Sequence, residues 1–170
     1  MFHAFDNDRP GKPVQRADWM SLLSRAPLEI METALDPFFL EPLQWLRKPE
    51  TGLMMVQGRA GATGERFNLG EVTVTRCALR LSSGDKSAAP VGVAYVLGRS
   101  HRQAQLAATA DALLQDPVHH QSLSSGLLVS VRQHLQQTSA DRYSRAQSTK
   151  VEFFTVAREA GSAGSEEEEK

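Results

Sequence analysis

The sequence predicts an α+β fold, with an antiparallel sheet of about four strands in a meander packed with an N-terminal helical hairpin and C-terminal helices. Three observations predict it. Apolar residues at helical spacing precede residue 36, short strand patterns with glycine and proline turns fill residues 43–97, and an alanine-rich helical segment follows. The short connections favour antiparallel pairing, because parallel strands need crossovers of a dozen or more residues.

The chain is about the size of one domain, with 170 residues of which 41% are hydrophobic. We expect a flexible arm over residues 1–15, a single domain over 16–159 and a disordered acidic tail over 160–170. The net charge of -1 gives no field that would attract nucleic acid or a membrane surface. One cysteine excludes an internal disulfide, and no signal peptide or apolar span is evident, so the expected location is the cytoplasm.

The predicted helical hairpin comprises one helix that begins near Arg16 and a second that follows Pro27. Asp36-Pro37 ends the second helix, because a residue before proline is pushed out of the α region. Four strand patterns follow, over residues 43–47, 53–57, 72–81 and 91–97. A turn at residues 48–52 separates the first two, and the segment SSGDKSAAP separates the last two.

The next helix is predicted to begin at Ser100, which has the spacing of a capping box with Gln103, and to end at Gln115. A further helix is expected over residues 123–136, and the polar residues 137–149 are ambiguous. Residues 151–156 fit a strand or an apolar docking segment. Within it Val151, Phe153 and Phe154 are candidates for packing on their own domain or for docking on another subunit, because permanent interfaces resemble a domain core.

The glycine-rich loop over residues 58–66 is the sharpest candidate for chemistry. Gly61 and Gly64 would let the backbone approach an anion, Thr63 offers a hydroxyl, and Arg59 and Arg66 are suited to phosphate oxygens. No helix pattern follows the loop, and it matches neither a Walker loop nor a dinucleotide fingerprint. The alternative is a long hairpin connection without a ligand.

Other residue types give weaker signals. Arg76 and Arg80 share one face of a strand, which suits an anionic ligand, a partner's carboxylates or plain solvation, whereas Cys77 on the opposite face is expected to be buried. No histidine has the i, i+4 spacing of a helical zinc site, so no metal site is predicted. Asp111 is a possible general base, but a lone carboxylate on such a helix is usually on its solvated side.

Several segments together resemble a known family. The run ETGLMMVQGRAGATGERFNLGEVTVTRCALRL, then AYVLGR with the helix containing DALLQ, then KVEFFTVARE, are similar in order and spacing to the G subunit (PhnG type) of the bacterial carbon-phosphorus lyase system. The resemblance covers roughly residues 16 to 159. It implies a subunit of the enzyme that transfers the ribose triphosphate of MgATP to an alkylphosphonate, releasing adenine and giving α-D-ribose 1-methylphosphonate 5-triphosphate.

The resemblance also implies partners. These are the H, I, J and L type subunits, with the I subunit as the closest contact, and MgATP is a substrate of the complex rather than a cofactor of this chain alone. In this reading the residues that support a partner's site or an interface are Arg59, Gly61, Thr63, Gly64, Arg66, Arg76 and Arg99. The alternative is an autonomous phosphate- or nucleotide-binding module that uses the loop directly. The catalytic residues stay unknown.

Overall fold

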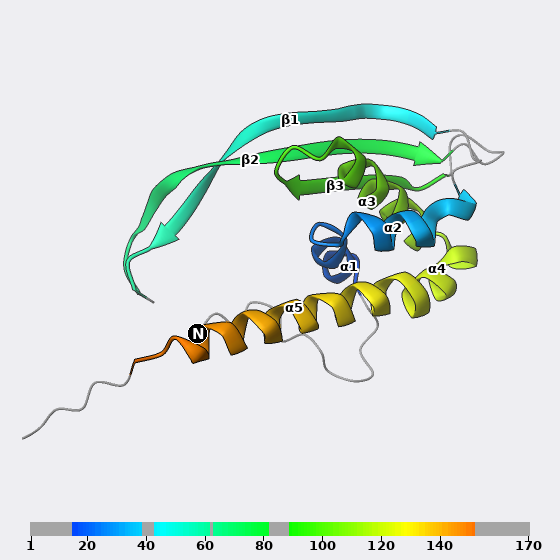
Figure 1. Cartoon of the computed structure of the whole chain (residues 1–170). Coiled ribbons are helices and arrows are strands. Elements are labelled where there is room, and N and C mark those ends of the chain that lie inside the picture. The colour runs from blue at the N-terminus through cyan, green and yellow to red at the C-terminus, as the bar shows by residue number, and fades with distance from the viewer. Residues whose placement is uncertain (1–14, 39–42, 62, 82–88, 152–170) are drawn as a thin grey trace, which may run out of the picture.

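The computed structural model describes residues 15–38, 43–61, 63–81 and 89–151. These residues form a three-stranded antiparallel sheet in the order β1-β2-β3, and helices cover one face of it (Figure 1). The strands are β1 (Leu43–Arg59), β2 (Arg66–Leu81) and β3 (Val91–Leu97). The helices are α1 (Arg16–Leu23), α2 (Leu28–Leu35), α3 (His101–Leu114), α4 (Pro117–Leu123) and α5 (Val129–Ser148), with a 3-10 turn at Asp36–Phe38 and a π-helical turn at Ser124–Leu128.

The α+β class and the antiparallel meander are confirmed, whereas the described residues form three strands rather than about four. The predicted strands 43–47 and 53–57 are parts of one 17-residue strand, β1. The expected turn at 48–52 is instead an irregular stretch, with register shifts between Trp45 and Arg47 and between Arg47 and Glu50. Proline is tolerated in an edge strand, so Pro49 distorts β1 without ending it.

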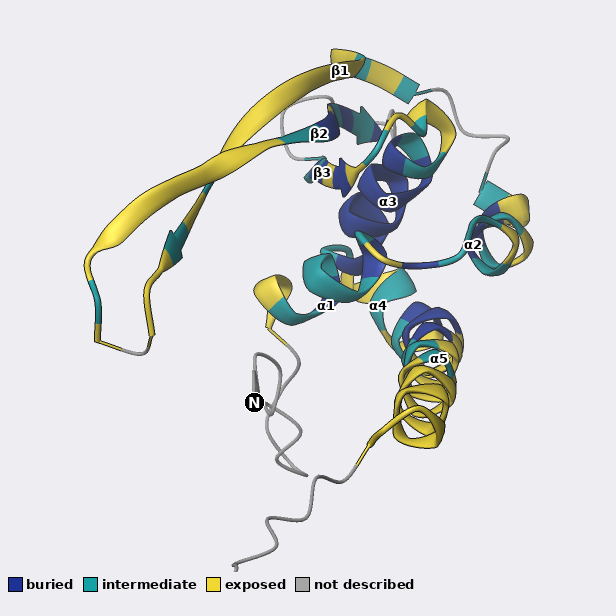
Figure 2. Ribbon diagram, turned by 60° about the vertical axis from the view of Figure 1, so that its left-hand side comes forward, coloured by how far each residue is buried: buried dark blue, intermediate teal, exposed yellow. Residues whose placement is uncertain are grey.

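Helix α3 lies at the centre of the molecule, between the sheet and the other helices (Figures 1 and 2). Ten of its 14 residues are buried, because both its sheet side and its helix side are covered. A helix that is buried all round needs small side chains where its neighbours approach closely. Alanine supplies them, and a Cβ at Gly92 of β3 would collide with the Ala108 carbonyl oxygen.

The helix-facing side of β2 carries Thr75, Cys77, Leu79 and Leu81, all buried. Cys77 is therefore buried as predicted, and its thiol donates a hydrogen bond to the Ala104 carbonyl oxygen at 3.0 Å. Burial raises the pKa of this thiol to about 12, because the thiolate would lose its hydration. The packing of β2 against α3 fixes which face of the sheet remains open.

The C-terminal helices differ in extent from the prediction. Helix α4 was not predicted; it begins at Pro117, and the Asp116 side chain accepts a hydrogen bond from the Val118 amide at 2.9 Å as its N-cap. Helix α5 continues to Ser148, through the ambiguous polar segment. Its only buried residue is Val131, so the pattern of apolar residues ends long before the helix does.

The predicted arm over residues 1–15 lies outside the described residues except for Gln15, and the acidic tail lies wholly outside them. Most of the loop between β2 and β3 is also outside them. Within the described ranges no helix is both long and apolar enough to cross a membrane.

Candidate functional site

Strands β1 and β2 extend far beyond the rest of the sheet as a two-stranded hairpin (Figure 1). The last β2 residue that pairs with β3 is Val74, opposite Leu97, and β2 begins at Arg66. At about 3.3 Å per residue, the intervening stretch of β2 is about 26 Å long. We call residues 53–73 the β1–β2 arm.

The β1–β2 arm is exposed on both of its faces (Figure 2). It nevertheless carries large apolar side chains with exposed fractions between 48% and 67%, namely Leu53, Met54, Met55, Phe67 and Leu69. Scattered exposed apolar residues are ordinary, but a contiguous group on a projecting element is typical of an interaction surface. The sequence had shown an apolar strand pattern here without showing that nothing in the domain covers it.

The tip of the arm brings together five of the predicted site residues. Arg59 and Arg66 are cross-strand partners that close the hairpin, and Gly61, Thr63 and Gly64 lie in the connection between them. Both arginines are exposed, and neither makes an ion pair with any residue that the structure describes. Like charges directly opposite one another destabilise a hairpin, so an anion at this point would be stabilising.

Two glycines at the tip have backbone reasons to be glycine. Gly61 has a positive φ of 68°, a left-handed conformation that residues with a Cβ rarely adopt. A Cβ on Gly64 would collide with the carbonyl oxygen of Ala60. The loop is thus a tight connection between two strands, and no helix N-terminus follows it.

The structure does not bring Arg76 or Arg99 to the tip. Arg76 is ten residues along β2 from Arg66, roughly 33 Å of extended strand. It lies on the open face of the sheet, where its Nε and the Nη1 of Arg47 each donate to Glu50 Oε1 at 2.7 Å. These hydrogen bonds hold the pKa of Glu50 below its ordinary value, and the one from Arg76 contributes most.

Arg99 is exposed and lies between β3 and α3, beyond the pair formed by Leu97 and Val74. It is therefore at the base of the arm. Nearby, buried Thr75 donates a hydrogen bond to the Gly98 carbonyl oxygen at 2.7 Å, and the Thr51 hydroxyl lies 3.0 Å from both Thr75 Oγ1 and His101 Nε2. Sequence reasoning missed this polar cluster, because its members are distant in the chain and alternate with apolar residues.

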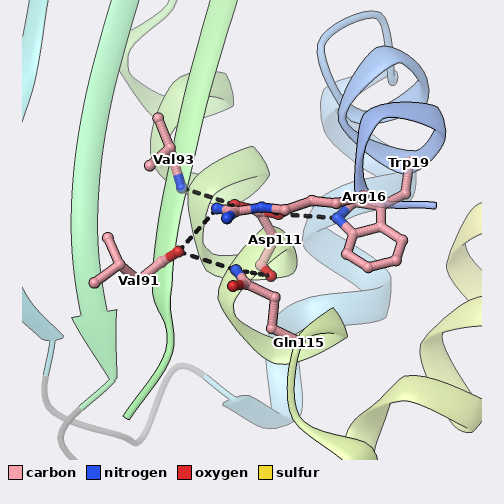
Figure 3. Close-up of polar contacts among 6 residues, drawn as sticks. All are labelled: Arg16, Trp19, Val91, Val93, Asp111 and Gln115. Atoms are coloured by element: carbon pink, nitrogen blue, oxygen red, sulfur yellow. Dashed lines mark hydrogen bonds and ion pairs between the residues drawn. The ribbon is translucent and has the colours of Figure 1, made fainter. Parts of the chain in front are cut away.

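Asp111 is fully buried, so the expectation that it lies on a solvated helix face is wrong. Its carboxylate accepts hydrogen bonds from Arg16 Nη2 at 2.7 Å and Nε at 3.1 Å, from Trp19 Nε1 at 2.9 Å and from the Val93 amide at 2.9 Å (Figure 3). The hydrogen bond to Asp111 raises the pKa of the Arg16 guanidinium above its ordinary value. With its acceptor sites filled, Asp111 connects α1, α3 and β3 and is not placed to act as a general base.

Of the candidate docking residues, only Val151 lies within the described part of the chain, where it follows α5 and is 68% exposed. Phe153 and Phe154 lie outside it. Across the described ranges no group of three histidine, cysteine or acidic side chains gathers at one point. The arm with its tip is therefore the feature of the described structure that is best placed to meet another molecule.

Comparison with known proteins identifies the family. The model of a family described as phosphonate metabolism protein PhnG matches residues 14–159. A protein of Rhizobium meliloti (strain 1021) named α-D-ribose 1-methylphosphonate 5-triphosphate synthase subunit PhnG is 39% identical over 145 residues, which are 85% of this chain and 89% of that protein. The family match covers most of the chain, including all three strands with the arm and all five helices. The chain belongs to the PhnG family of phosphonate metabolism proteins.

Proposed function

We propose that this chain is a required subunit of a complex that transfers the ribose triphosphate of MgATP to an alkylphosphonate such as methylphosphonate. In that reaction a phosphonate oxygen forms a bond to the ribose C1, the bond from C1 to adenine breaks, and adenine leaves with a proton. The product is α-D-ribose 1-methylphosphonate 5-triphosphate. The observation that carries the proposal is the 39% identity to a protein named as a subunit of this synthase.

The geometry is consistent with a subunit that is inactive alone. Asp111, the carboxylate that the sequence offered as a general base, is buried and its hydrogen bonds are made within the fold. The arginines of the tip and of the open sheet face point to no common site. We therefore assign MgATP to the complex as its substrate and expect the catalytic groups to lie on other subunits or at an interface.

The partners in this proposal are the H, I and L type subunits for the transfer step, with I as the closest contact. The J type subunit acts later, when the carbon-phosphorus bond is cut. Arg59, Thr63, Gly64 and Arg66 at the tip, and Arg76 and Arg99 nearer the body, support a partner's site or hold the interface.

An omission assay tests this role. Adenine release from MgATP and methylphosphonate is measured with the purified G, H, I and L type subunits and again without this chain. The expected result is release that depends on the chain and is absent from the chain alone. Full release without it would refute the proposal.

The competing function is a module that binds phosphate or nucleotide by itself, which the opposed Arg59 and Arg66 would favour. A ligand that binds the folded state raises its apparent stability by RT ln(1 + [L]/Kd). A thermal shift of the isolated chain with millimolar MgATP would support that module. An unchanged melting temperature would favour the subunit role.

A further inference from the structure

The free edge of β3 is protected from pairing with another strand. Asp111 accepts a hydrogen bond from the Val93 amide at 2.9 Å. The Val91 carbonyl oxygen accepts from Arg16 Nη2 at 3.0 Å and from Gln115 Nε2 at 2.9 Å (Figure 3). Side chains thus occupy backbone groups that an added strand would need, which is a known defence of exposed sheet edges.

The opposite edge of the sheet, formed by β1, is protected only beside the body. Here two register shifts interrupt the strand between Trp45 and Glu50, and the same stretch contains Lys48 and Pro49. Irregular pairing, lysine and proline each discourage the addition of a further strand. These features stop at Glu50.

Beyond Glu50 the edge of β1 has none of these protections. Pairing with β2 is regular from Glu50 to Val56, and the segment contains neither proline nor lysine. Alternate residues of an edge strand direct their N–H and C=O groups away from the neighbouring strand. No other described residue makes a hydrogen bond to backbone groups of residues 51–56 outside the β1–β2 ladder.

The side chains of the same segment also lack cover. Leu53 and Met55 lie on one face of the arm and Met54 on the other, with exposed fractions of 67%, 48% and 49%. A two-stranded hairpin is marginally stable in water by itself, and a third strand with apolar side chains would stabilise it. The matching edge of β2 is less suitable, since a bulge lies beside Gly70 where the register shifts.

Charge disfavours a second copy of this chain as the occupant. If residues 51–56 of two copies paired antiparallel with Thr51 opposite Val56, the exposed Arg59 of each copy would lie near the exposed Lys48 of the other. Like charges that lie close together on neighbouring strands repel one another and destabilise the pairing. A strand flanked by carboxylates would instead meet positive charge at both ends of the segment.

We propose that the free edge of β1 over residues 51–56 accepts an extended strand from a different subunit of the complex. That strand has alternating apolar side chains, matching Leu53 and Met55 on one face and Met54 on the other, and carboxylates at its ends that face Lys48 and Arg59. Main-chain hydrogen bonds give such an interaction its strength and the side chains give its specificity. The inference rests on the proposed function, since it takes the partner from the complex.

Hydrogen exchange of the backbone amides tests the contact directly. The full chain is measured alone and then in the complex purified with the H, I and J type subunits. The expected result is that the amides of residues 51–56 exchange more slowly in the complex than in the chain alone at the same concentration. A complex in which these amides exchange unchanged would overturn the inference while leaving the proposed function standing.

Three other results would also decide the matter. Slowing in the chain alone, together with a dimer mass, would make a second copy the occupant and overturn the inference. Slowing by MgATP without partners would assign the segment to a ligand and also overturn it. Absence of any complex would remove the proposed function and the inference together.

A pair of matched variants tests whether the partner contacts the arm or the open face of the sheet. Leu53→Lys on the arm and Leu97→Lys on β3 change residues that are 67% and 70% exposed, so neither should alter the melting temperature of the isolated chain. We expect Leu53→Lys to weaken association by more than about tenfold and Leu97→Lys to leave it unchanged. Equal weakening by both, or by Leu97→Lys alone, would contradict the assignment of the contact to the arm edge.

Discussion

Replacing Asp111 with alanine should destabilise the fold severely, because this carboxylate connects three elements from inside the core. The substitution leaves the Trp19 indole N–H and the Val93 amide without the acceptor that lies 2.9 Å from each. A buried donor without a partner costs about 1–3 kcal/mol, and this full cost applies to the buried Trp19 indole. The Val93 amide is only part-buried and adds less, so the two together give a loss of about 2–4 kcal/mol. The Arg16 contribution is smaller, since its side chain is 44% exposed and regains water.

This loss is large beside a typical unfolding free energy of about 5–15 kcal/mol. In a chain of this size each kcal/mol lowers the melting temperature by about 2–4 °C, so a loss near ~3 kcal/mol predicts a decrease of roughly 6–12 °C. Urea denaturation followed by circular dichroism gives the free energy, and a thermal scan gives the melting temperature. Asp141→Ala, on the exposed part of α5, is the matched control and should change stability by less than ~0.5 kcal/mol.

A double-mutant cycle makes the test specific to the hydrogen bonds. Trp19→Phe removes the indole donor and keeps most of the ring, so part of its cost arises from the bond to Asp111. That part should disappear when Asp111 is already alanine, and the two substitutions should therefore be less than additive. Additive effects, or an Asp111→Ala variant as stable as the Asp141→Ala control, would refute the reasoning.

Four further predictions concern the core and the arm. Gly92→Ala should lower the unfolding free energy by about 1–3 kcal/mol, because its Cβ collides with the Ala108 carbonyl oxygen; urea denaturation measures this, and wild-type stability would contradict the close packing. Cys77 should resist thiol reagents in the native protein and react once it is unfolded, and labelling at equal rates would contradict its burial. The pKa of Cys77 is higher in the folded state than in the unfolded state, so the unfolded thiol loses its proton first as the pH rises. The unfolding free energy should therefore be unaffected by Cys77 below the unfolded pKa and should decline from that pKa up to about pH 12, which urea titrations above pH 8 would detect. Arg66→Ala should reduce adenine release by the complex while leaving the melting temperature of the isolated chain unchanged, and unaltered release would exclude a role for the tip.

The sequence predicted those elements whose periodicity is local and strong. Ser100 marks the start of α3, where its hydroxyl accepts a hydrogen bond from the Gln103 amide at 3.2 Å, and α2 ends directly before Asp36-Pro37. The reason expected for that end is wrong, because Asp36 keeps α-region dihedral angles (φ -48°, ψ -44°) and begins a 3-10 turn over Asp36–Phe38. The buried state of Cys77 followed from strand alternation. In each case the deciding interaction spans only a few residues.

Predictions that depended on distant contacts were less successful. The continuity of β1 through Pro49 depends on pairing with β2, which a local turn signal cannot reveal. Asp111 was expected to be solvated, because its partners Arg16 and Trp19 are more than 90 positions away in the chain and only the fold of α1 brings them to it. Arg76 and Arg66 share one strand, but its length keeps them apart, so the predicted site residues form a tip cluster and separate positions nearer the body.

The arm itself was the feature that the sequence located but could not interpret. The pattern around Leu53 predicts a strand, yet Leu53, Met54 and Met55, which look like core residues in the sequence, are exposed. Only the tertiary arrangement distinguishes an apolar strand that fills a core from one that projects from it.

The most direct test of the subunit role is native mass spectrometry of this chain, expressed alone and then together with the H, I and J type subunits from the same genome. The account predicts a stoichiometric complex that contains this chain. A chain that remains alone in the presence of all three subunits would contradict it.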